Sequence, residues 1–143
     1  DRAYLAGLRE MVRDRGLGDC VRFIGSVPHS EAVRHVQGCD FFVNMHHEGG
    51  LGKAVLEAMS AGKPAFVSTP TYYDRFPSYG EAFLFPARDP DTLARKMLAA
   101  AEMPGEERAR IGNDLREWVL AEHDVRRQMS RIAAVLRKVK GGR

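Results

Sequence analysis

Residues 48–64 have the sequence EGGLGKAVLEAMSAGKP and follow closely on the apolar run FFV at residues 41–43. The apolar run is typical of a buried strand, and residues 52–61 predict a helix with Val55, Leu56 and Met59 on one side. Three glycines lie in the turn between the two segments. The stretch therefore predicts a strand, a glycine-rich loop and a helix in direct succession.

The start of this helix is suited to an anion. No Ser, Thr, Asp or Asn stands at the expected N-cap, so the first backbone N–H groups lack an obvious side-chain partner. Gly49, Gly50 and Gly52 let a phosphate approach the backbone closely, and the partial positive charge of the helix start favours it. Lys53 adds a full positive charge, and Glu57, one helical turn on, can accept hydrogen bonds from ribose hydroxyls. The pattern suits a nucleotide diphosphate.

A plainer interpretation of the same residues is a surface ion pair. Lys53 and Glu57 lie four residues apart, which is the spacing of an ordinary pair on an exposed helix. The glycine-rich turn matches neither G-x-G-x-x-G nor G-x-x-x-x-G-K-[ST]. The local pattern alone leaves both interpretations open.

Four stretches extend the pattern along the chain: LGDCVRFIGSV (17–27), CDFFVN (39–44), LEAMSAGKP (56–64) and FPARDPDTLA (85–94). Together they resemble the C-terminal nucleotide-binding domain of the retaining, nucleotide-sugar-dependent glycosyltransferases of family 4. The resemblance implies half of a GT-B architecture, an α/β fold with a Rossmann-like parallel sheet flanked by helices and a helical C-terminal tail. It also implies transfer of a sugar from a nucleotide-diphosphate sugar to a glycan or lipid-linked acceptor.

The resemblance also implies a donor site. In this family two glutamates separated by seven residues flank the turn and the helix start, and the second contacts the ribose hydroxyls. Glu57 matches the second glutamate. The implied binding residues are Gly49, Gly50, Leu51, Gly52, Lys53, Ala54 and Glu57. Lys53 is also expected to act in catalysis by stabilising the departing diphosphate, and neither a metal nor another cofactor is expected.

The first glutamate of the family pattern has no direct match. Eight residues separate Glu48 from Glu57, and Gly49 stands where the first glutamate is expected. Either the loop bulges by one residue and brings Glu48 to the donor sugar as a catalytic group, or the chain represents a branch with a small residue at this position. We favour the second alternative.

The length of 143 residues suffices for one domain but not for a two-domain transferase. We expect residues 1–122 to form a partial Rossmann-like domain that lacks its first strand, helix and strand, and residues 123–143 to form a basic amphipathic helix and tail. An acceptor-binding N-terminal domain of the same protein is the expected partner. This fragment alone is expected to be inactive.

The rest of the chain alternates strands and helices, as in a parallel sheet covered by helices. The expected helices are residues 1–15, 29–36, 89–102, 104–122 with a break or bend near Gly112, and one opened by Asp124. The expected strands are residues 21–24, 40–44, 64–68 and 82–85. Ligands of such sheets bind at the carboxyl ends of the strands, which places the site after Asn44.

The C-terminal segment holds the excess positive charge. Between Asp124 and Arg143 there are seven basic residues and one acidic residue, so the remainder of the chain is net negative. Apolar residues at helical spacing make this segment amphipathic with a cationic face. Packing on a protein domain is the default expectation, and peripheral contact with an anionic membrane surface is the alternative. Nucleic acid is not expected, because no aromatic residues interleave the basic ones.

Cys20 and Cys39 are too few for a disulfide scaffold and indicate a reducing compartment. No segment of the sequence is apolar and long enough for a transmembrane helix. We therefore expect a cytoplasmic protein, with a peripheral position at the cytoplasmic membrane face as the alternative.

Two further loops carry polar and aromatic residues. His46, His47 and Glu48 are adjacent and lack the spacing of metal ligands, so no metal site is expected, and the two histidines can instead line the sugar pocket. Residues 69–74 follow a strand end and can either touch the donor or simply pack.

Two other functions stay open from the sequence. A noncatalytic nucleotide-sugar-binding module would share the fold but lack a working first acidic position, as Gly49 indicates. A GT-B sugar-nucleotide epimerase would also use a glycine-rich turn and a ribose-binding carboxylate, but it needs no acceptor.

Overall fold

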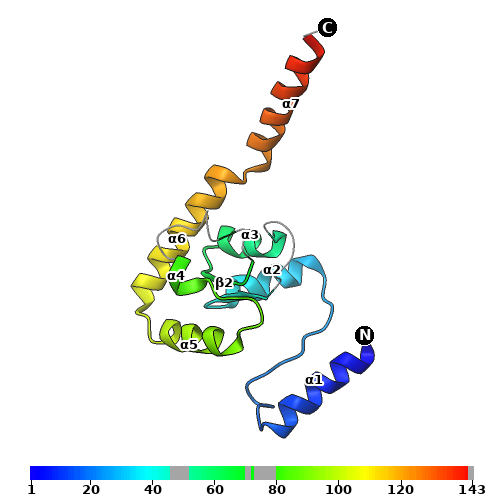
Figure 1. Ribbon diagram of the computed structural model, residues 1–143, viewed down its shortest axis with the longest axis vertical. Coiled ribbons are helices and arrows are strands. Elements are labelled where there is room, and N and C mark those ends of the chain that lie inside the picture. Colours follow the sequence, from blue (N-terminus) through cyan, green and yellow to red (C-terminus); the bar gives the residue numbers. More distant parts are fainter. Residues whose placement is uncertain (46–51, 70–71, 73–79, 142–143) are drawn as a thin grey trace. The chain divides into compact units, whose positions relative to one another are not determined.

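The computed structural model describes residues 1–45, 52–69, 72 and 80–141 (Figure 1). The chain divides into two units, Asp1–Ala32 and Val33–Arg143. The boundary between the units falls inside helix α2 (His29–Gly38). The presence of α2 confirms the helix that the sequence predicted from residue 29.

The first unit contains helix α1 (Arg2–Asp14) and the segment that leads into α2. The Asp1 carboxylate caps α1 by accepting hydrogen bonds from the backbone N–H groups of Ala3 (2.9 Å) and Tyr4 (3.3 Å). The strand expected at residues 21–24 is wrong, because these residues form no strand. A strand needs a neighbour to pair its backbone groups, and the described residues of this unit contain none.

The second unit is built on a small parallel sheet. Strand β1 (Phe42–Asn44) pairs in parallel with β2 (Ala65–Val67), and Val43 lies opposite Phe66. These two strands confirm the ones expected within residues 40–44 and 64–68. Helix α3 (Lys53–Ser60) connects them, as the glycine-rich stretch predicted. The parallel α/β class expected from the alternating pattern is therefore confirmed.

The next expected strand, residues 82–85, is largely replaced. Gly80–Phe83 forms the short helix α4 instead, and only Leu84 joins the sheet, through a parallel bridge to Val67. The backbone N–H of Phe85 then donates to the carbonyl of Val67 (3.2 Å). The chain thus reaches the sheet edge for a single residue before it turns away.

Three helices complete the second unit: α5 (Pro90–Ala101), α6 (Gly105–Glu122) and α7 (Val125–Gly141). Asp89 caps α5 through a 2.9 Å hydrogen bond from the Thr92 N–H, and proline follows it at the first turn, both as expected. Asp124 accepts a hydrogen bond from the Arg127 N–H (2.9 Å) and opens the last helix.

The core lies between the sheet, α3 and α6 (Figure 1). The ring of Phe66 is fully buried and packs against Phe41 (5.7 Å between centroids) and Phe83 (5.1 Å). Helix α6 adds Leu115 and Ile111 to the same cluster. The apolar side of α3 therefore packs against the sheet, and α6 packs against α3.

The break expected in α6 near Gly112 is wrong, because α6 runs without interruption from Gly105 to Glu122. Gly112 is buried where α6 crosses the turn after α3, next to Gly62. The glycine is needed there for a close contact between two backbones and does not interrupt the helix.

None of residues 125–140 of helix α7 is buried, whereas α3, α4, α5 and α6 each bury at least one residue. The exposed apolar residues of α7 are Val125, Met129, Ile132, Val135, Leu136 and Val139. The expected packing of this face on the domain is therefore not seen within the described part of the chain. None of the described helices is both long and apolar enough to cross a membrane.

Candidate functional site

The carboxyl edge of the sheet brings together residues from two strands. β1 ends at Asn44, and the backbone N–H of Ser68, directly after β2, donates to the Asn44 carbonyl (3.3 Å). Ser68 and Thr69 are both buried although they are polar. Since parallel strands end at the same edge, this is where ligands of such sheets bind.

Helix α3 begins at this edge without a side-chain cap. Gly52 is its N-cap residue and makes no side-chain hydrogen bond, as the sequence predicted. Among the described residues, no group accepts a hydrogen bond from the backbone N–H of Lys53 or Ala54. Within this part of the chain, these donors and the positive end of the helix are suited to an anionic ligand.

Asn44 and the start of α3 are close to each other. A Cβ atom on Gly52 would lie 3.6 Å from Val55 Cγ2 and 4.0 Å from Asn44 Nδ2. The glycine thus leaves a space at the helix start that is bordered by the side-chain amide of Asn44. Sequence reasoning used Asn44 only as the end of a strand, although a polar residue directly after an apolar run was the available signal.

Lys53 and Glu57 lie on one side of α3. Lys53 Nζ is 3.5 Å from Glu57 Oε1, and their side chains are 88% and 44% exposed. An exposed pair at this spacing contributes at most about 1 kcal/mol to stability. Both groups can consequently exchange their mutual contact for contacts with a ligand at little energetic cost.

Thr69 and Tyr72 are the described residues of the segment 69–74. Tyr72 is fully buried, and burial raises the pKa of its hydroxyl to about 12. Thr69 is buried as well, and its carbonyl accepts a hydrogen bond from the backbone N–H of Tyr72 (3.2 Å). Both residues therefore pack into the domain, which is the plainer of the two roles expected for this segment.

Several expected site residues lie outside the described part of the chain. They are His46, His47, Glu48, Gly49, Gly50 and Leu51. The structure therefore does not test whether Glu48 reaches the donor sugar or whether the small residue Gly49 takes the place of the first glutamate. The structure places the other expected residues, Gly52, Lys53, Ala54 and Glu57, together in the first turns of α3.

No metal site is found within the described ranges, where no three His, Cys, Asp or Glu residues cluster. The two described cysteines, Cys20 and Cys39, are both free. Burial raises the pKa of the Cys39 thiol, although nearby Lys63 opposes the shift. Cys39 thus behaves as a small, partly buried residue and not as an activated nucleophile.

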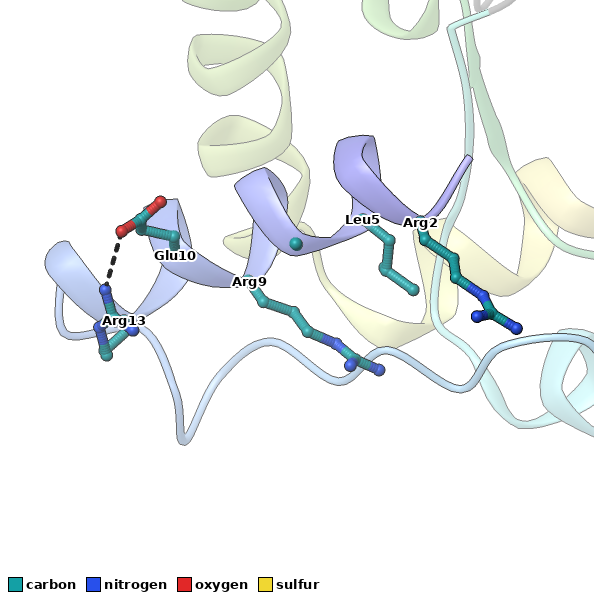
Figure 2. Close-up of a pocket in the computed structure, with 6 residues that line it drawn as sticks. Arg2, Leu5, Arg9, Glu10 and Arg13 are labelled. Atoms are coloured by element: carbon teal, nitrogen blue, oxygen red, sulfur yellow. Dashed lines mark hydrogen bonds and ion pairs between the residues drawn. The ribbon is translucent and has the colours of Figure 1, made fainter.

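The first unit has a hollow of about 680 Å³ along one side of α1, which Figure 2 shows. Arg2 and Arg9 project on either side of Leu5, and Arg13, farther along the helix, is paired with Glu10 (3.2 Å). All of its lining residues belong to a single helix. It has no second wall and no converging polar groups, so it lacks the shape of a small-molecule site.

Comparison with known proteins gives one match. The model of the family described as glycosyl transferases group 1 matches residues 1–118. No curated protein and no solved structure matches the chain. The matched region includes the carboxyl edge of the sheet and the start of α3, and it ends within α6, so that α7 lies outside it.

Proposed function

The chain belongs to the glycosyl transferases of group 1, and on that premise we propose that its carboxyl sheet edge binds the diphosphate of a nucleotide-sugar donor. In this proposal the chain is the donor-binding part of a retaining glycosyltransferase. The enzyme transfers the sugar to a glycan or lipid-linked acceptor held by another domain of the same protein.

One observation supports the location best: the uncapped start of α3 opens beside Asn44 at the carboxyl ends of both strands. Two backbone N–H groups without partners in the described structure lie there, and Lys53, whose ammonium is 3.5 Å from Glu57 Oε1, belongs to the same first turn. This donor set complements a diphosphate and leaves the Glu57 carboxylate for the ribose hydroxyls.

The chemistry that follows is stabilisation of a leaving group. When the bond between the anomeric carbon and the diphosphate breaks, negative charge grows on the diphosphate oxygen. The helix start and Lys53 stabilise that charge more strongly than the charge of the intact donor. Binding and departure of the diphosphate need no metal in this proposal, and the acceptor supplies the hydroxyl that replaces the diphosphate.

The test is ligand-observed NMR of the purified chain with UDP, GDP, ADP and their sugar conjugates. We expect one nucleotide to bind. Glu57→Ala should lose the part of the affinity that comes from the ribose, and Lys53→Ala should weaken binding of the diphosphate group. Arg110→Ala is the matched control, because Arg110 forms a similar exposed pair with Asp114 (3.8 Å) on α6. Equal binding by all variants, or no binding by a folded chain and by the full-length protein, would contradict the proposal.

Product analysis of the full-length protein separates the remaining functions. A transferase releases nucleoside diphosphate only when an acceptor is present, whereas an epimerase converts the donor without one. A noncatalytic module binds the nucleotide and forms no product. The proposed transfer is supported only if nucleoside diphosphate is released when an acceptor is present and if Lys53→Ala abolishes this release.

We also propose that helix α7 binds an anionic lipid surface, separately from the donor site. Between Val125 and Lys140 there are six basic residues and no acidic residue, and the apolar side of the helix is exposed. This charge complements anionic lipid, and Met129, Ile132 and Leu136 can enter the interface. The proposal implies a cytoplasmic protein at the membrane face.

Vesicle sedimentation tests this contact. We expect the chain to sediment with phosphatidylcholine vesicles that contain phosphatidylglycerol and not with pure phosphatidylcholine. Ile132→Ser together with Leu136→Ser abolishes the binding, whereas Leu98→Ser, at a leucine of α5 that is also exposed, leaves it unchanged. Retention of α7 by a separately expressed acceptor-binding domain, with no vesicle binding, would show that the helix docks on protein.

A further inference from the structure

A second groove lies at the opposite, amino edge of the sheet. It has a volume of about 340 Å³, within the range of small-molecule sites. Its walls are the residues that precede β1, the residues that precede β2, and one side of α6. Unlike the hollow on α1, which a single helix lines, it is bordered by three separate segments of the same unit and stays open to solvent.

Cationic groups dominate this groove. Lys63, Arg108 and Arg116 line it, and Asp40 is the only carboxylate among its lining residues. Arg108 Nη2 is 3.1 Å from Asp40 Oδ1, and the Arg108 guanidinium also lies over the ring of Phe41, 5.6 Å from its centroid. One cation is thus neutralised and fixed in position.

The other two cations have no such partner. Neither Lys63 nor Arg116 forms an ion pair with any described residue. Asn113 of α6 also lines the groove, and its side-chain amide can donate hydrogen bonds. The groove therefore presents an excess of positive charge and several hydrogen-bond donors.

The start of α6 faces the same groove. Gly105, its first residue, is part of the lining, and Pro104 at the N-cap supplies no side-chain hydrogen bond. The positive end of the helix dipole thus adds to the charge of Lys63 and the two arginines. The helix start strengthens the site, but the side-chain cations define it.

We propose that this groove is a second anion site, which binds the phosphate group of a small molecule independently of the donor site. Lys63 and Arg116 form charge-assisted contacts with the phosphate, and Arg108, held by Asp40, closes one side. The site lies at the amino ends of β1 and β2, whereas the donor site lies at their carboxyl ends. The proposal does not rest on the transferase reaction.

Site-resolved NMR with pyrophosphate and with inorganic phosphate tests the proposal, with sodium chloride at matched ionic strength as the reference. We expect saturable shifts of the backbone amides of Gly62, Lys63 and Gly105, separate from any shifts at Gly52 and Lys53. Lys63→Gln or Arg116→Gln should each raise the Kd about fivefold at these amides. Arg110→Gln, which removes an α6 arginine outside the groove, should not change it.

Asp40→Asn gives a test in the opposite direction. It removes the one carboxylate of the lining from a side chain that is 72% exposed, so the fold should persist. We expect this variant to bind pyrophosphate more tightly, because repulsion from Asp40 is lost. Loss of function through misfolding cannot produce a gain in affinity.

The results for the two sites are independent. Shifts at Gly52 and Lys53 without shifts at Lys63 and Gly105 would overturn the second site and leave the donor site intact. Shifts in the groove that sodium chloride reproduces, or that Lys63→Gln and Arg116→Gln leave unchanged, would also overturn it. Saturable groove shifts with no binding at Gly52 would support the second site alone.

Discussion

Gly112 of α6 lies so close to Gly62 that a Cβ atom on Gly112 would be 2.1 Å from the Gly62 carbonyl oxygen. Gly62 has a φ of +73° and ends α3, where its N–H donates to the Met59 carbonyl (2.9 Å) and the Lys63 N–H donates to the Ala58 carbonyl (3.0 Å). This pair of hydrogen bonds is the Schellman arrangement, in which the left-handed residue is usually glycine. Two glycines thus set the distance between α3 and α6.

Gly112→Ala should destabilise the protein. The added methyl group collides with backbone atoms, which cannot move aside as a flexible side chain does, and we expect a loss of about 2 kcal/mol in the free energy of unfolding. Urea unfolding followed by circular dichroism measures it. Gly105→Ala on the same helix is the control, because a Cβ atom there meets nothing within 4 Å. Equal stability of the two variants would show that α6 shifts freely against α3.

Gly52→Asp should separate binding from stability. Aspartate caps helices slightly better than glycine, so the free energy of unfolding should change by less than about 0.5 kcal/mol. The new carboxylate would occupy the helix start and repel a diphosphate, so nucleotide binding should disappear. Isothermal titration and thermal unfolding measure the two effects. Gly52→Ser, which caps without charge, should weaken binding less, and normal binding by Gly52→Asp would contradict the proposed position of the diphosphate.

The stability of α5 should depend on acidic pH through Asp89. The hydrogen bonds from the backbone and side chain of Thr92 lower the pKa of Asp89 below its ordinary value of 3.8. Because the folded-state pKa is the lower one, the stabilisation is complete above 3.8 and is lost as the pH falls through the folded-state pKa. Asp89→Asn keeps a capping group without the titration, so its stability should vary less over this range. A pH profile of Asp89→Asn equal to that of the unaltered protein would show that protonation of Asp89 does not affect stability.

Tyr72 should limit stability at alkaline pH. Its pKa rises from 10.0 to about 12 on folding, because the buried phenolate would be poorly solvated. The unfolded chain therefore loses this proton first, and stability should fall as the pH increases from 10 to 12. Thermal unfolding of Tyr72→Phe should show a weaker decline over that interval. Tyr4→Phe is the control, since Tyr4 is 68% exposed, and the expectation fails if both variants behave alike.

Much of the fold followed from local sequence patterns. The β1, α3 and β2 segments, the Asp89 cap and the uncapped start of α3 all appeared where the sequence predicted them. The strand at residues 21–24 did not appear, because apolar β-branched residues favour a strand only where a neighbouring strand can pair with them. The strand at residues 82–85 shrank to the single bridge at Leu84, because Gly80–Phe83 forms helix α4 instead.

The candidate site was predicted only in part. The expected group around Gly52, Lys53 and Glu57 lies on one helix, so its 3.6-residue period was enough to place these residues together. Asn44 was missed as a member of the site, because its closeness to Gly52 depends on where the start of α3 lies relative to the end of β1. The groove of Lys63 and Arg108 was missed for a similar reason, since its residues lie far apart in the sequence.

The sequence by itself determined the helix caps, the strand-loop-helix order and the family, because these depend on contacts between residues a few positions apart and on the order of motifs. Only the tertiary structure decided what Gly112 does. A glycine in a helix has the same sequence signature whether it breaks the helix or lets another backbone approach, and the choice depends on Gly62, which is fifty residues away along the chain. Packing across that distance brings the backbones together and requires the missing side chain.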